Sequence, residues 1–137
     1  MIGIVIVTHG HLAQEILKTA EFIVGSLEAC ATVSIDNSRG PDAMREAIRE
    51  AIGSVSRGQG VLVLTDMFGG TPSNISLSFL EAGRVEILTG VNLPMLIKAI
   101  GVREKMSLGE AAQTIGEYSR KSITVAGELL GGPGEAQ

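Results

Sequence analysis

Two polar residues come directly after two strongly apolar runs of the chain. His9 follows the β-branched run 2–8 (IGIVIVT), and Asp66 follows the run 60–65 (GVLVLT). Parallel strands joined by right-handed crossovers end at one edge of a sheet, where the imidazole and the carboxylate would meet. A carboxylate that accepts the N–H of one ring nitrogen leaves the other nitrogen bare for attack on phosphorus. We therefore expect His9 to accept a phosphoryl group and Asp66 to orient its ring.

A glycine-rich segment follows Asp66 and leads into a predicted helix. Pro72 suits the first helical turn, with Thr71 as the expected N-cap. The backbone N–H groups of Gly69 and Gly70 and the hydroxyl of Thr71 could hold phosphoryl oxygens at this helix N-terminus. The segment contains no Lys or Arg, so amide dipoles would hold the group only modestly. Modest binding suits a carrier, which must release its cargo.

Simpler interpretations of the same residues stay open. A histidine at a strand end is often structural or merely exposed, Asp66 alone could orient a turn, and Asp36 is typical of a turn. His11 is expected in the first turn of a helix, as a solvated side chain. A zinc site is disfavoured because the chain has only two histidines and one cysteine.

The rest of the chain alternates between strand and helix patterns. Strands are predicted at 2–8, 30–35, 60–65, 84–88 and 122–126 (SITVA), and helices at 11–24, from about Pro41, after Thr71, at 93–100 behind Asn92, and from Ser107 to about Tyr118. The pattern predicts an α/β fold with an open, mostly parallel four-stranded sheet, helices on both faces and a fifth, C-terminal strand.

Composition narrows the class of protein. The 137 residues suit one domain, expected over 1–126 with a flexible tail over 127–137. A hydrophobic content of 45% with only 3% aromatic residues suits a sheet covered by helices. A net charge of −4 without a run of basic residues argues against nucleic-acid binding. Without a basic N-terminal region or about 18 consecutive apolar residues, we expect a cytoplasmic protein with no direct membrane insertion.

Three motifs together resemble a known family: VTHGHLA at 7–13, DMFGGTPSN at 66–74 and GVNLPML at 90–96. In order and spacing they resemble the IIA component of the mannose-family phosphoenolpyruvate-dependent sugar phosphotransferase system, over about residues 1–126. The resemblance implies that Nε2 of His9 carries the phosphoryl group, that Asp66 hydrogen-bonds Nδ1, and that Thr71 lines the site.

The resemblance also implies partners. Family members take the phosphoryl group from the histidine phosphocarrier protein HPr and pass it to a IIB component, without a metal or cofactor. They form homodimers, often by exchanging a C-terminal strand, for which 122–126 is well placed. Many relatives continue through a linker into a IIB domain, whereas this sequence ends after GGPGEAQ, so we expect a separate subunit.

Three alternatives remain. The phosphocarrier subunit of dihydroxyacetone kinase has a similar fold and an N-terminal histidine, but 66–74 and 90–96 look more like the mannose family. A receiver-like module would bind Mg²⁺ or be phosphorylated at an aspartate, but it needs paired acidic residues after the first strand. A regulatory domain could keep the fold without transferring phosphate.

Overall fold

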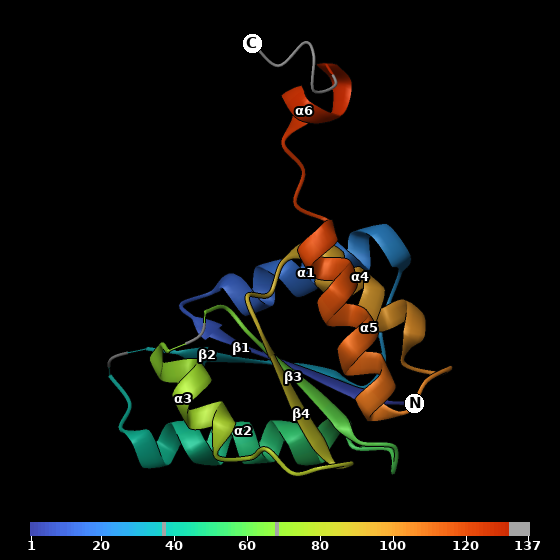
Figure 1. Cartoon of the computed structure of the whole chain (residues 1–137). Coiled ribbons are helices and arrows are strands. Elements are labelled where there is room, and N and C mark those ends of the chain that lie inside the picture. The colour runs from blue at the N-terminus through green and yellow to red at the C-terminus, as the bar shows by residue number, and fades with distance from the viewer. Residues whose placement is uncertain (37, 68, 132–137) are drawn as a thin grey trace.

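The computed structural model describes residues 1–36, 38–67 and 69–131. Its sheet has four parallel strands in the spatial order β2-β1-β3-β4 (Figure 1): β1 (Gly3–His9), β2 (Cys30–Ile35), β3 (Val61–Thr65) and β4 (Val85–Thr89). The predicted α/β fold with an open parallel sheet is confirmed.

Helices cover both faces of this sheet, as the strand–helix alternation predicted. The described helices are α1 (Leu12–Val24), α2 (Pro41–Val55), α3 (Thr71–Leu77), α4 (Leu93–Val102), α5 (Leu108–Lys121) and α6 (Ala126–Gly131). Helices α1, α4 and α5 lie on one face, and α2 and α3 lie on the other (Figure 1). Within the described ranges, no helix is both long and apolar enough to cross a bilayer.

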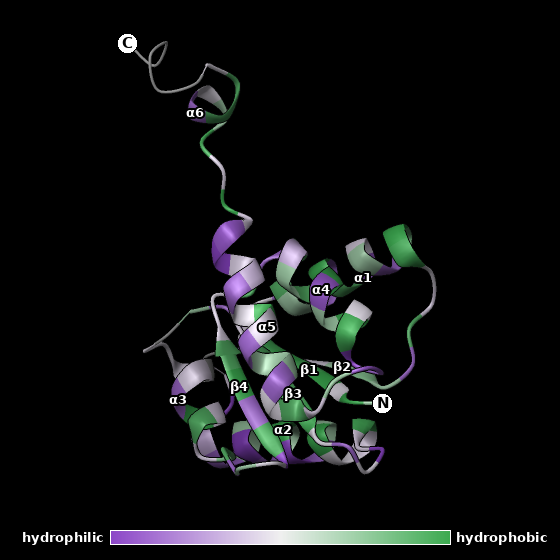
Figure 2. Cartoon of the chain, turned by 45° about the vertical axis from the view of Figure 1, so that its right-hand side comes forward, coloured by the Kyte–Doolittle hydropathy of each residue, from purple (hydrophilic) through white to green (hydrophobic). Residues whose placement is uncertain are grey.

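The central strand β1 belongs to two hydrophobic cores. Ile4 and Ile6 pack in the core beneath α1, α4 and α5, whereas Val5 and Val7 pack in the core above α2 and α3. All four side chains are fully buried. Alternate residues of a strand point to opposite faces, and a strand covered on both faces therefore reads as a continuous apolar run (Figure 2). The same alternation decides which way the residues at the end of β1 point.

Two predicted helix starts are confirmed by their capping contacts. Asn92 precedes α4, and its side-chain oxygen accepts a hydrogen bond from the N–H of Met95 at 2.8 Å. Ser107 precedes α5, where its hydroxyl accepts from the N–H of Glu110 at 3.4 Å and donates to the carboxylate of Glu110 at 2.8 Å. Both contacts satisfy a backbone N–H that has no partner inside the helix.

The prediction of a last strand at 122–126 is wrong for the single chain. Residues 123–125 have no regular structure, and α6 begins at Ala126. The segment leaves α5 away from the sheet (Figures 1 and 2), so none of the described strands lies beside it to supply the hydrogen bonds that a strand needs. Helix α6 begins at Ala126, the last residue of the predicted domain, and continues into the predicted flexible tail, of which residues 132–137 are outside the described part. The domain bounds remain a prediction.

Candidate functional site

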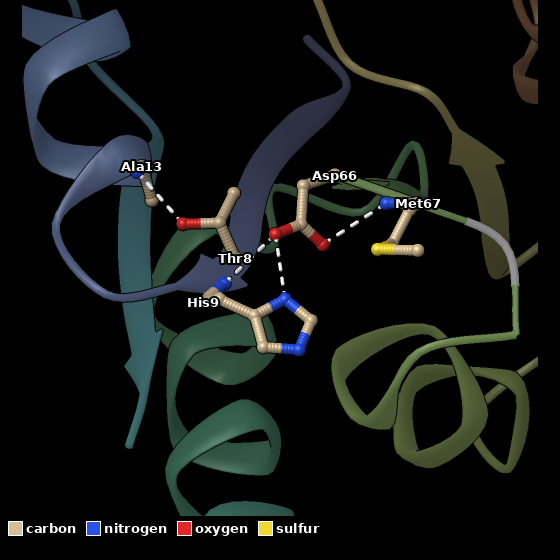
Figure 3. Close-up of polar contacts among 5 residues, drawn as sticks. All are labelled: Thr8, His9, Ala13, Asp66 and Met67. Carbon is tan, nitrogen blue, oxygen red and sulfur yellow. Dashed lines mark hydrogen bonds and ion pairs between the residues drawn. The ribbon is translucent and has the colours of Figure 1, made fainter.

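Strand register brings His9 and Asp66 together. Strands β1 and β3 are parallel neighbours with Val7 opposite Thr65, so His9 and Asp66 both lie at the carboxyl edge just beyond this pair. Thr8 points toward α1, as the alternation along β1 requires, and the ring of His9 lies on the other side (Figure 3). The contact between His9 and Asp66 that the sequence predicted is present.

Within the part of the chain that the structure describes, Asp66 accepts three hydrogen bonds. Its Oδ2 accepts from the ring Nδ1 of His9 at 2.8 Å and from the backbone N–H of His9 at 3.0 Å (Figure 3). Its Oδ1 accepts from the backbone N–H of Met67 at 3.0 Å. The carboxylate is therefore fixed in place by its own strand end and by the end of β1.

Opposing influences act on the pKa of Asp66. Partial burial raises this pKa, because loss of water disfavours the charged form. The hydrogen bonds from the backbone and ring of His9, the electrostatic attraction of His9 and the bond from Met67 lower it, and together they prevail. The pKa of Asp66 therefore lies below its ordinary value, and at neutral pH the carboxylate is an acceptor only.

An ionised carboxylate determines which nitrogen of His9 carries the proton. Because Asp66 has no proton to donate, Nδ1 must be the N–H, and Nε2 of the neutral ring has a free lone pair. Nε2 lies on the side of the ring away from Asp66 (Figure 3). The His9 side chain is 51% exposed, against 13% for Asp66, so a second molecule can reach the bare nitrogen.

Two contacts that the sequence patterns did not predict shape the turn after β1. The buried hydroxyl of Thr8 accepts a hydrogen bond from the N–H of Ala13 at 2.8 Å and so satisfies a free donor in the first turn of α1. Gly10 has a φ of +55° and donates its N–H to the carbonyl of Ile35 at 3.1 Å. The sequence signal for the first contact is a threonine near the end of the strand that leads into α1. Together they tie the segment that carries His9 to α1 and β2.

The glycine loop reaches the same site from β3. Gly70, not Thr71, is the N-cap of α3, and its carbonyl accepts from the N–H of Asn74 at 2.9 Å. The prediction of Thr71 as N-cap is therefore wrong by one residue, because the helical hydrogen bonds begin at Gly70. Thr71 is the exposed first residue of α3. Gly70 lies against the ring of His9, and Gly69 and Thr71 are its neighbours in the sequence.

Two other candidates make separate local contacts. His11 is exposed, and its Nδ1 lies 3.1 Å from the amide oxygen of Gln14, as expected of a surface side chain. Asp36 accepts a hydrogen bond from the N–H of Ser38 at 2.8 Å, which is the contact of a turn residue. The structure thus joins His9 to Asp66 and Gly70, and gives His11 and Asp36 partners of their own.

Comparison with known proteins agrees with this geometry. The family model of the PTS system fructose IIA component matches residues 3–116. The chain is similar to the fructose-specific EIIA component of Bacillus subtilis, with 30% identity over 131 residues, covering 95% of this chain and 90% of that protein.

Two further similarities point the same way. The mannose-specific EIIAB component of Escherichia coli K12 is 33% identical over 104 residues, which are 75% of this chain but 32% of that longer protein. The crystal structure of phosphotransferase system component EIIA from Streptococcus agalactiae superposes with a TM-score of 0.82 at 29% identity, covering 92% of this chain and 98% of that one.

Proposed function

Because the chain belongs to the family of PTS system fructose IIA components, we propose that it carries a phosphoryl group on Nε2 of His9. The observation that carries this proposal is the pairing of Nδ1 with Asp66, which leaves Nε2 bare on a half-exposed ring. The sequence resemblance to the mannose-family IIA component is confirmed, and with it a phosphotransferase type of protein. The phosphohistidine and its partners are proposals.

The proposed transfer has two steps. The lone pair of Nε2 attacks the phosphorus of a phosphohistidine on HPr, so that a new Nε2–P bond forms as the donor's N–P bond breaks. Nδ1 keeps its proton, and the negative charge of Asp66 stabilises the positive charge that develops on the ring. A IIB component then takes the phosphoryl group from Nε2 by the same exchange. Both steps are proposed to occur in the cytoplasm, and neither needs a metal or an organic cofactor.

The glycine loop is proposed to contact the phosphoryl oxygens. Gly70 adjoins the ring of His9, which supports contacts from the backbone N–H groups of Gly69 and Gly70. The exposed Thr71 hydroxyl follows directly along the chain. Neutral donors of this kind bind a phosphoryl group without the strong ion pair that would slow its release.

We also propose a homodimer. Strand β4 is at one end of the sheet, and a groove between it and α5 is lined by residues that include Leu88, Gly116 and Ile123. Ile123 and Val125 are 77% and 61% exposed on the segment that leaves α5. An unpaired strand edge beside exposed apolar residues favours pairing with another chain. The exchange of residues 122–126 between two chains would cover both.

The test is to mix the protein with phosphorylated HPr and to record its intact mass. The expected result is the gain of one phosphoryl group, lost in acid and kept in base, as for a phosphoramidate bond. His9→Ala is expected to gain none, whereas His11→Ala is expected to react like the unchanged chain. An acid-stable adduct, or equal phosphorylation of His9→Ala, would overturn the proposal.

A further inference from the structure

Gly70 lies beside the ring of His9 in a backbone conformation that does not require glycine. Its φ of −80° and ψ of 169° are extended values open to any L-residue. Gly69, by contrast, has a φ of +85°, a region that favours glycine. The effect of a side chain at position 70 therefore depends on the space around it.

His9 and Met67 limit that space on the sides where they lie. A Cβ added to Gly70 would lie 3.1 Å from Cε1 of His9, 3.2 Å from Cγ of Met67 and 3.8 Å from Nε2 of His9. Carbon atoms in favourable contact are about 3.5–4.0 Å apart. A single methyl group would therefore crowd both the imidazole of His9 and the side chain of Met67.

Hydrogen bonds to Asp66 hold the imidazole of His9 in place, so moving it away from residue 70 would weaken them. Its Nδ1 is bonded to Oδ2 of Asp66 at 2.8 Å, and the backbone N–H of His9 is bonded to the same oxygen at 3.0 Å. The other oxygen of Asp66 is held by Met67. Rotation of the ring away from residue 70 would disturb the hydrogen bond that orients Nε2.

We propose that the missing side chain of Gly70 keeps Nε2 of His9 clear and its ring in place, which makes Gly70 a positioning residue for phosphoryl acceptance. This role rests on the proposed function for its reaction. It is separate from a backbone contact to phosphate, because Gly70→Ala keeps the N–H and adds only a carbon.

The chain offers a matched control for this substitution. Gly40 is the N-cap of α2, with a φ of −74° and a ψ of 166°, and no atom of the described residues lies within 4 Å of a Cβ added there. Gly40→Ala and Gly70→Ala therefore make the same change at the same helical position, in nearly the same backbone conformation. Only the second adds a carbon beside His9.

Two donors separate this inference from the proposed function. Phosphoramidate, a small donor, gives its phosphoryl group to Nε2 and releases ammonia, and phosphorylated HPr tests the protein-to-protein reaction. Gly70→Ala is expected to react about tenfold more slowly than Gly40→Ala with either donor. The ring ¹⁵N shifts of His9 are expected to change in Gly70→Ala only. Equal rates of phosphorylation by phosphoramidate for the two variants would overturn the inference. If the unchanged chain reacts with phosphoramidate but not with phosphorylated HPr, that result would count against the proposed function.

A second variant tests whether the crowding is at the ring. Met67→Ala removes Cγ but keeps the backbone N–H that holds Asp66, so the methyl group at position 70 gains room to move away from His9. The double variant Met67→Ala/Gly70→Ala is expected to react within about threefold of Met67→Ala, and this comparison holds even where Gly70→Ala alone does not fold. A double variant that remains about tenfold slower than Met67→Ala would place the damage in the loop and contradict the inference.

Discussion

One oxygen of Asp66, Oδ2, accepts hydrogen bonds from both the ring Nδ1 of His9, at 2.8 Å, and the backbone N–H of His9, at 3.0 Å. The same atom therefore holds the strand end and the ring that projects from it. Any change that moves the carboxylate therefore alters both the position of the His9 ring and the hydrogen bond that keeps the proton on Nδ1. This double contact makes the orientation of Nε2 a property of two neighbouring strands rather than of one flexible side chain.

Asp66→Asn is expected to slow phosphorylation of His9 by about 10²-fold while the fold is kept. The amide can turn its NH₂ group toward the ring, which favours the tautomer whose proton is on Nε2, and it lacks the negative charge that stabilises the ring during transfer. The initial rate of phosphorylation by phosphorylated HPr measures this effect. Asp36→Asn, which removes a carboxylate bonded to Ser38, is the control and should leave the rate unchanged. Equal rates for the two variants would remove Asp66 from the mechanism.

The stability that Asp66 contributes should depend on pH. The pKa of Asp66 is lowered in the folded protein, so its contribution is fully present above the unfolded value of about 3.9 and is lost as the pH falls through the lower folded value. The difference in thermal midpoint between the unchanged chain and Asp66→Asn should therefore be present at pH 5 to 7 and shrink below about pH 4. If the difference in thermal midpoint grew as the pH fell, the result would contradict a lowered pKa of Asp66 in the folded protein.

Thr8→Val is expected to lower the free energy of unfolding by about 1–2 kcal/mol, because it keeps the shape but leaves the buried N–H of Ala13 without its acceptor. Urea denaturation measures this loss. Thr19→Val, an exposed change within α1, is the control and should stay within about 0.5 kcal/mol of the unchanged chain. A loss of equal size in both variants would mean that the Thr8 contact has no special weight.

Ile123→Asp/Val125→Asp is expected to abolish the proposed homodimer, because two charges would replace the exposed apolar side chains of the segment proposed to pair with β4 of a second chain. Light scattering coupled to size-exclusion chromatography should give the mass of two chains for the unchanged protein and the mass of one chain for the variant. Leu129→Asp/Leu130→Asp in α6 should remain dimeric. An unchanged protein that is monomeric, or a variant that stays dimeric, would refute the exchange.

The repeating elements of this fold were predictable because their signals are local. The run at 2–8 is continuous and β-branched because β1 is buried on both faces. Asn92 and Ser107 are residues typical of N-caps, and each predicts the start of a helix. The meeting of His9 with Asp66 followed from a general rule, since parallel neighbours end at one edge.

The remaining details depend on contacts that no local pattern records. The apolar, β-branched residues of 122–126 suit a strand, yet strand formation needs a partner, and no strand among the described residues lies beside them. The start of α3 shifted by one residue because Gly70 already accepts a helical hydrogen bond. Gly70 and His9 are about sixty residues apart in the sequence, so only the packing of the chain reveals that they lie side by side.

The most direct test of the central claim is to identify the atom that carries phosphorus. NMR of the ¹⁵N-histidine-labelled protein, phosphorylated by HPr, reports phosphorus coupling at the substituted ring nitrogen. We predict coupling at Nε2 of His9, with the proton retained on Nδ1 opposite Asp66. Coupling at Nδ1 of His9, or at either nitrogen of His11, would contradict the account.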